Sequence, residues 1–180
     1  MKPLFPVRGD AGKMLDDYVR VVLANGLSPN KMVEVGAYAG LSASIFSKHF
    51  NLVFSVDPWI DNYDVSDKIC DTDVFAPIHA SEQAFDDVTQ NLSNVIKMKM
   101  FSHEAADHFG DKTLDFVYID ADHQYEPTLL DLKSWLPKIK PGGIIGGHDW
   151  DFESVQQAVQ EILGGADVAP ITDQNWYKKI

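Results

Sequence analysis

Five short apolar runs alternate with segments of helical periodicity, and this alternation limits the chain to a small set of folds. The apolar runs occupy residues 32–35, 52–56, 95–98, 114–119 and 144–147. Helices are expected between and after them, at residues 41–49, 81–92, 104–108, 128–136 and 154–163. Strands that are joined through a helix lie parallel in one sheet. The pattern therefore predicts an α/β fold, a doubly wound and mostly parallel sheet with helices on both faces.

The two ends of the chain complete this picture. Residues 1–28 are expected to form an arm and a helix, because apolar residues recur at helical spacing from Met14 to Leu23 and stop before Gly26. We expect this helix to cover one edge of the sheet. Strand-like pieces at residues 168–171 and 176–179, after a turn at 141–143, bring the sheet to seven strands, with an antiparallel strand near the C-terminus.

Residues 58–80 mix acidic, amide and aromatic side chains without a clear period, which predicts an inserted loop or lid over a site. The whole chain, residues 1–180, has the usual size of one domain, and its 45% hydrophobic content can bury a core without disulfides. One domain is therefore expected.

Composition restricts the compartment and the partners. Cys70 is the only cysteine, so no intramolecular disulfide can form, and a reducing, cytoplasmic location is expected. No apolar run is long enough to cross a bilayer, and we expect no membrane partner. The formal net charge of −12 would repel phosphate backbones, which disfavours nucleic acid as a partner.

A glycine turn follows the first predicted strand. The strand ends near Glu34, and Gly36 and Gly40 bracket the turn that leads into the next helix. Asp57 ends the second strand, 23 positions after Glu34, where a carboxylate can accept hydrogen bonds from ribose hydroxyls. An adenosine cofactor is implied. A dinucleotide fingerprint would need glycine at Tyr38, so the turn favours S-adenosylmethionine, which carries no pyrophosphate.

At this point residues 33–40 (VEVGAYAG) resemble the first motif of class I S-adenosylmethionine-dependent methyltransferases. Residues 116–126 (FVYIDADHQYE) and the stretch from PGG at 141–143 to HDW at 148–150 resemble the small-molecule O-methyltransferase branch, near the macrocin and catechol O-methyltransferases. The resemblance implies a Rossmann-like fold and methyl transfer to an oxygen of a small molecule.

The resemblance also implies roles for individual residues. Asp57 would hold the ribose, Glu34 would support the glycine loop or the methionine amine, and Ser102 with His103 would lie along the adenine edge. The full set of cofactor-binding residues expected is Glu34, Gly36, Ala37, Tyr38, Gly40, Asp57, Ser102, His103 and Asp120.

Two chemical devices could activate the acceptor. In the first, Asp120, His148 and Asp149 converge from neighbouring strand ends and bind a divalent cation, Mg or Mn, which lowers the pKa of a substrate hydroxyl. The catechol-type pattern has an acid and an amide where this chain has His148 and Asp149. The structural alternative is that Asp149 or Asp151 caps the helix that begins near residue 153, and that His148 packs beneath Trp150.

In the second device His123 acts as a general base, and Asp120 or Asp122 fixes its tautomer. The expected catalytic residues are thus His123 and Asp120. Aromatic side chains could wall an acceptor pocket, namely Trp59, Tyr63, Phe75, Trp150 and Phe152, although each could equally be ordinary core.

Two other functions remain open at the level of sequence. The chain could be a binding module that holds S-adenosylmethionine without turnover, or a nicotinamide-dependent oxidoreductase on the same sheet, which Tyr38 argues against. The chain has little material for an acceptor domain, so a homodimer partner could complete the pocket.

Overall fold

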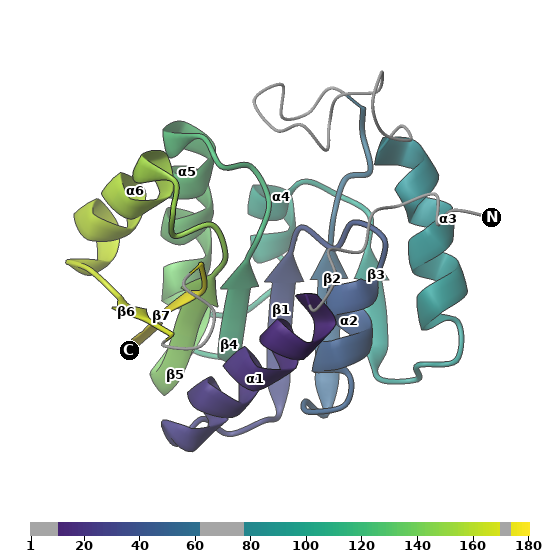
Figure 1. Ribbon diagram of the computed structural model, residues 1–180, viewed down its shortest axis with the longest axis horizontal. Coiled ribbons are helices and arrows are strands. Elements are labelled where there is room, and N and C mark those ends of the chain that lie inside the picture. The colour runs from purple at the N-terminus through teal and green to yellow at the C-terminus, as the bar shows by residue number, and fades with distance from the viewer. Residues whose placement is uncertain (1–10, 62–77, 170–173) are drawn as a thin grey trace.

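The computed structural model describes residues 11–61, 78–169 and 174–180. Within these ranges, seven strands form one sheet in the order β3-β2-β1-β4-β5-β7-β6 (Figure 1). The strands are β1 (Lys31–Val35), β2 (Leu52–Val56), β3 (Val95–Met98), β4 (Leu114–Ile119), β5 (Ile139–Gly147), β6 (Asp167–Val168) and β7 (Trp176–Lys179). β1 to β5 pair in parallel, and β7 pairs antiparallel with both β5 and β6. The predicted seven-stranded, mostly parallel sheet with an antiparallel C-terminal strand is confirmed.

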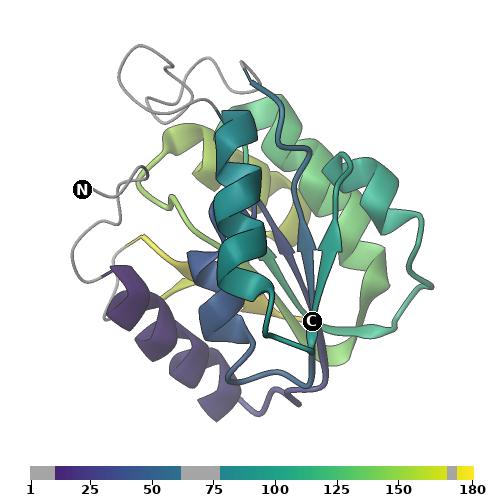
Figure 2. The ribbon, with the colours of Figure 1, turned by 90° about the vertical axis from the view of Figure 1, so that its right-hand side faces the viewer.

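Helices cover both faces of the sheet, as predicted, and Figure 2 views the sheet from its β3 edge, where α3 lies. One face carries α1 (Ala11–Ala24), α2 (Leu41–Phe46) and α3 (Ile78–Thr89), and the other carries α4 (Ser102–Ala106), α5 (Tyr125–Trp135) and α6 (Glu153–Leu163). All six residues of β4 are buried, which is typical of a central parallel strand that helices cover on both sides.

The N-terminal helix lies elsewhere than predicted. Tyr18 and Val22 of α1 belong to the same buried cluster as Phe116 and Tyr118 of the central strand β4. The Tyr18 ring lies 5.6 Å from that of Tyr118, centroid to centroid. The prediction that this helix covers an edge of the sheet is wrong: its apolar stripe packs on the middle of one face, where it buries more apolar surface.

Several boundaries also differ from the predicted ones. The turn expected at residues 141–143 lies inside β5, and residues 78–80 of the expected insert belong to α3. The remainder of that insert from residue 62 to residue 77, with Cys70, lies outside the described residues, as do residues 170–171 of the expected strand at 168–171. Within the described ranges, no helix combines the length and apolar character that a membrane span requires.

Candidate functional site

The strand order reverses between β1 and β4, and the predicted site residues meet at that point. Val35 pairs with both Val56 and Ile119, and Ile119 pairs with Gly147. The residues that directly follow these paired ends are Gly36, Asp57, Asp120 and His148. They therefore lie in a row along the carboxyl edge of the sheet, at the upper end of the strands in Figure 1, which is where ligands bind in open α/β sheets.

Gly36 permits the loops that follow β1 and β4 to touch. Its φ angle is +90°, and a Cβ atom at this position would lie 1.8 Å from the carbonyl oxygen of Asp120. The N–H of Asp120 in turn donates to the carbonyl of Val35 at 2.8 Å. A side chain at position 36 would separate the two loops, so the glycine is required for the shape of the site.

Asp57 fixes the glycine turn from the end of β2. Its carboxylate accepts the backbone N–H of Tyr38 at 2.9 Å and that of Trp59 at 2.7 Å. Burial raises the pKa of Asp57, and backbone N–H groups of Tyr38, Trp59 and Ala37 oppose that rise. Tyr38 has a φ of +42°, and its carbonyl accepts the Trp59 indole N–H at 2.8 Å. The turn thus holds a tyrosine in a left-handed conformation that usually favours glycine.

Gly40 closes the same turn as the N-cap residue of α2, with a φ of +83°. Ala37, within the same turn, is buried in a cluster with Trp59 and with Phe85 of α3. Trp59, predicted as a pocket wall or as core, is core.

Glu34 is a buried acid beneath the turn, with 1% of its surface exposed. Its Oε1 accepts the hydroxyl of Ser55, whereas its Oε2 is buried without a hydrogen-bond partner among the described residues. Burial raises the pKa of Glu34 to about 8, against the lowering effect of the Ser55 and Ser42 hydroxyls. A buried acceptor of this kind is costly unless a ligand satisfies it.

Ser102 and His103, which are expected along the adenine edge, begin α4, just beyond β3. The Ser102 hydroxyl is buried and accepts the indole N–H of Trp135 at 2.8 Å. It also hydrogen-bonds Asp131 of α5. Burial raises the pKa of Asp131 to about 7, and this hydrogen bond opposes the rise. The hydroxyl therefore belongs to the interface between α4 and α5. His103 is exposed, with its ring 6.0 Å from that of Phe101. Their contact with adenine stays a prediction.

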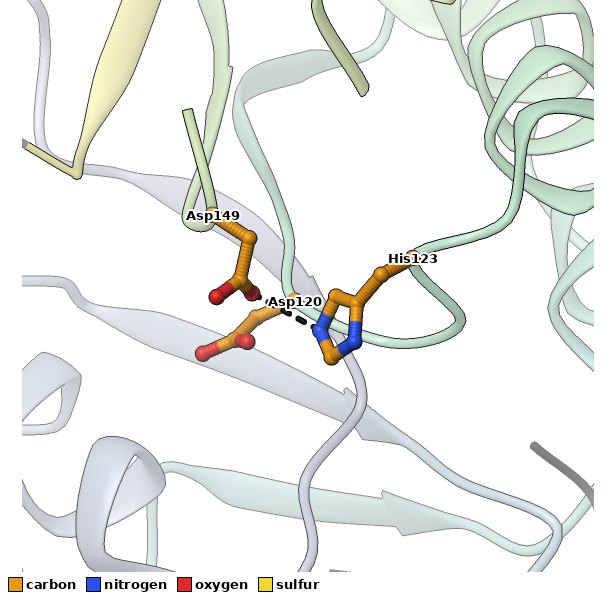
Figure 3. A group of neighbouring side chains, drawn as sticks. All are labelled: Asp120, His123 and Asp149. Carbon is orange, nitrogen blue, oxygen red and sulfur yellow. Dashed lines mark ion pairs between the residues drawn. The ribbon is translucent and has the colours of Figure 1, made fainter. Parts of the chain in front are cut away.

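Asp120, His123 and Asp149 form the cluster drawn in Figure 3, with one donor atom from each lying within 4.8 Å of the others. His123 Nε2 lies 2.8 Å from Asp149 Oδ2. His148 flanks the cluster, with its Nδ1 3.0 Å from Asp149 Oδ1 and 4.0 Å from Asp120 Oδ1. The Asp149 carboxylate thus lies between two imidazoles.

The pKa values of the two acids in the cluster are shifted in opposite directions. Burial, together with the charge of Asp149, raises the pKa of Asp120 to about 6 against the effect of both histidines, although 36% of the Asp120 side chain still reaches solvent. Burial would also raise the pKa of Asp149, but hydrogen bonds from His123 and His148 outweigh it and hold that pKa well below its usual range. Asp149 therefore keeps its charge in acid, whereas Asp120 takes up a proton as the pH falls through about 6.

The predicted metal trio and the observed cluster share Asp120 and Asp149 but differ in the histidine, because His123 takes the place expected for His148. The acid that pairs with His123 is Asp149, whereas Asp122 accepts the N–H of Gln124 within its own loop at 2.8 Å.

The alternative prediction that Asp149 or Asp151 caps the helix α6 is wrong. The N-cap residue of α6 is Phe152, and among the described residues no side chain forms a capping hydrogen bond there. Phe152 instead stacks on the ring of His123, with centroids 5.1 Å apart. Tyr63 and Phe75, two of the other predicted pocket aromatics, lie outside the described residues.

Sequence reasoning missed a group of side chains beside this cluster, at the start of α5 and along α6: Tyr125, Glu153, Gln156, Gln157, Gln160 and Glu161. Their spacing of three and four residues on α6 was the available signal, since it places the amides and carboxylates on one side of the helix.

Comparison with known proteins bears on the family and the fold of this chain. A family model described as a methyltransferase domain matches residues 33–150. An uncharacterized protein of Sinorhizobium fredii, y4gI, is 26% identical over 133 residues, which are 71% of this chain and only 14% of that protein. The chain thus spans about a seventh of the length of this curated relative.

The fold is similar to those of several solved proteins. The O-methyltransferase NovP superposes with a TM-score of 0.69 at 16% identity, over 93% of this chain and 78% of that one. The calicheamicin methyltransferase CalS11 gives 0.65 at 15% identity, over 98% and 82%. Fibrillarin from Aeropyrum pernix, solved with S-adenosyl-L-methionine bound, gives 0.58 at 14% identity, over 91% and 74%.

The matched family segment begins in β1, contains the glycine turn, Asp57 and the Asp120 cluster, and ends just after Asp149. It covers every element that builds the carboxyl edge of the parallel strands. This chain therefore belongs to the family of methyltransferase domains.

Proposed function

We propose that this chain transfers a methyl group from S-adenosylmethionine to a hydroxyl oxygen of a small molecule. The observation that carries the proposal is the contact between two parts of the site: Gly36 of the cofactor turn lies against the backbone of Asp120, which begins the acid–histidine cluster. Methyl transfer needs a nucleophile held beside the methyl donor, and adjoining sites provide for both. The similarity in fold to NovP, named an O-methyltransferase, and to CalS11, named a TDP-rhamnose 3'-O-methyltransferase, supports oxygen as the target.

The residues around the turn fit the cofactor. Glu34 Oε2 makes no hydrogen bond within the described part of the chain, and the protonated amine of the cofactor would supply a donor and favour the charged carboxylate. Asp57 is held by backbone N–H groups, and its carboxylate would accept the ribose hydroxyls. When bound, S-adenosylmethionine supplies an electrophilic methyl group on its sulfonium.

His123 would accept the proton of the substrate hydroxyl. With its Nε2 proton donated to Asp149, the basic nitrogen of the ring is Nδ1. The charged Asp149 would stabilise the imidazolium that forms, and His148 fixes the orientation of that carboxylate from its other side. Asp149 thus takes the orienting role that the sequence assigned to Asp120 or Asp122.

A divalent cation is the second arrangement that the cluster supports. Two carboxylates and one imidazole, from Asp120, His123 and Asp149, form a donor set that suits Mn²⁺ and also admits Mg²⁺. A cation there would lower the pKa of a coordinated hydroxyl. The two arrangements compete for His123, because Nε2 cannot both donate to Asp149 and bind a cation.

Calorimetric titration with S-adenosylhomocysteine, followed by transfer of labelled methyl to a panel of sugars and phenols, tests the proposal. We expect binding and an O-methylated product. Label on nitrogen or carbon would refute oxygen as the target. Binding without transfer to any acceptor would favour a binding module, and binding of a nicotinamide cofactor instead would favour an oxidoreductase.

Exhaustive chelation separates the two arrangements of the cluster. Full turnover of the chelated protein would exclude the cation, whereas activity that returns only with Mg²⁺ or Mn²⁺ would exclude the metal-free base.

A further inference from the structure

A groove of about 600 Å³ lies between the start of α5 and one side of α6. Two aromatic side chains, Tyr125 and Trp150, form part of its wall. The remainder comes from five residues of α6, of which Glu153 and Glu161 are acidic and three are glutamines. A volume of this size is within the range of small-molecule sites, which is about 300–1,000 Å³.

The groove shares its supporting loops with the acid–histidine cluster. Tyr125 follows His123 by two residues, at the first position of α5, and Trp150 directly follows Asp149. The loop from β4 to α5 therefore carries Asp120 and His123 and leads directly into Tyr125, and the loop from β5 to α6 carries Asp149 and Trp150. A molecule bound in the groove is thus placed beside the loops that hold the cluster.

The hydrogen bonds within the groove leave it rich in acceptors. The Tyr125 hydroxyl donates to Glu161, and one amide N–H of Gln157 donates to Glu153 at 3.1 Å. The Gln156 amide donates to the carbonyl of Trp150 at 2.5 Å. A carboxylate offers about four acceptor positions, so Glu153 and Glu161 each retain several after these bonds.

The charge of the groove is negative and is not balanced locally. Of the described side chains that line it, two are carboxylates and none is lysine, arginine or histidine. In the parts of the chain that the structure describes, neither Glu153 nor Glu161 forms an ion pair. A ligand that brings a positive charge and several N–H donors would complement both the charge and the acceptors. The faces of Tyr125 and Trp150 also attract cations.

We propose that this groove binds the protonated amine of a small hydroxylated molecule, and that the methyl acceptor is accordingly an amino sugar. The assignment as the acceptor rests on the proposed function. An amine on a sugar-sized body accounts for the charge, the aromatic walls and the volume together, whereas a bare metal ion would use neither the walls nor the volume.

Titration with D-glucosamine and with its neutral N-acetyl derivative, followed by NMR, tests the groove in the absence of any methyl donor. The double variant Glu153→Gln/Glu161→Gln removes the charge and retains the shape. Asp107→Asn is the control, since it removes one exposed carboxylate at the C-cap of α4, outside the groove. We expect wild type and the control to prefer glucosamine by about tenfold, the scale of one cation–π and ionic contact, and the double variant to lose that preference.

Equal affinity of the wild type for the two sugars, or an undiminished preference in the double variant, would overturn the proposal. Since neither measurement involves S-adenosylmethionine, failure here leaves the methyltransferase assignment intact. Amine binding by a protein that fails to transfer methyl groups would overturn the acceptor assignment and with it the proposed function.

Discussion

Replacing Gly36 by alanine tests whether the contact between the β1 and β4 loops builds the site. Two effects add in this variant. An L-residue at a φ of +90° costs about 1–2 kcal/mol, because its Cβ crowds the backbone. The new Cβ would also lie 1.8 Å from the Asp120 carbonyl oxygen, well inside the 3.0 Å that real Cβ atoms keep, so the loop after β4 must retreat by more than about 1 Å.

Overpacking of this kind typically costs a further ~1–3 kcal/mol, so we expect Gly36→Ala to lower the free energy of unfolding by roughly 2–5 kcal/mol. For a chain of this length that corresponds to a fall in Tm of about 4–20 °C. Because the retreating loop carries Asp120, affinity for S-adenosylhomocysteine and methyl transfer should fall as well.

Gly142→Ala is the matched control, since Gly142 has a φ of +83° and no atom of the described residues lies within 4 Å of its would-be Cβ. Only the backbone cost of about 1–2 kcal/mol applies there. Urea unfolding of both variants, with calorimetry of cofactor binding, separates the two effects. If Gly36→Ala proves no less stable than Gly142→Ala and binds S-adenosylhomocysteine normally, the two loops do not depend on their contact and the reasoning is refuted.

Two further predictions concern buried acids. Burial raises the pKa of Asp131 from 3.8 in the unfolded chain to about 7, so the folded state retains a proton that the unfolded state releases. The free energy of unfolding should then fall between about pH 4 and 7, by up to ~1.4 kcal/mol per pH unit. Asp131→Asn should flatten this decline when unfolding by urea is measured across that pH range. An unchanged slope in the variant would contradict the prediction. Asparagine tolerates the φ of +57° at position 149, so Asp149→Asn removes the charge between the two imidazoles without straining the backbone. We expect kcat to fall by about 10²–10⁴-fold with an unaltered circular dichroism spectrum. Activity within threefold of wild type would exclude the role of Asp149.

The sequence by itself determined which segments form strands, because strand formation here follows local apolar runs. The predicted strands at 52–56, 95–98 and 114–119 coincide with β2, β3 and β4. Helix ends were less predictable. α5 begins at Tyr125, ahead of the predicted residue 128, because Pro127 lies in the first turn, where its missing N–H costs nothing.

The local turn signal at residues 141–143 was overridden by tertiary pairing. Gly142 donates its N–H to the carbonyl of Ile180 at 2.6 Å, and Ile180 donates to Gly143 at 2.9 Å. The C-terminal segment thus keeps the Pro-Gly-Gly stretch within β5, with an irregular register against β4. Nothing in residues 141–143 themselves encodes a partner that is almost forty positions away.

For the site, strand ends placed Glu34, Gly36, Asp57 and Asp120 at one edge, since parallel strands bring their carboxyl ends together. Which histidine approaches which acid depended on loop conformation. The left-handed backbone at Asp149 and the loop that carries His123 bring those two side chains to 2.8 Å, and no spacing along the chain specifies that distance. The groove beside α6 likewise exists only because α5 and α6 pack on the same face of the sheet. Sequence thus determined the fold and the edge that holds the site, and tertiary packing decided how the side chains pair there.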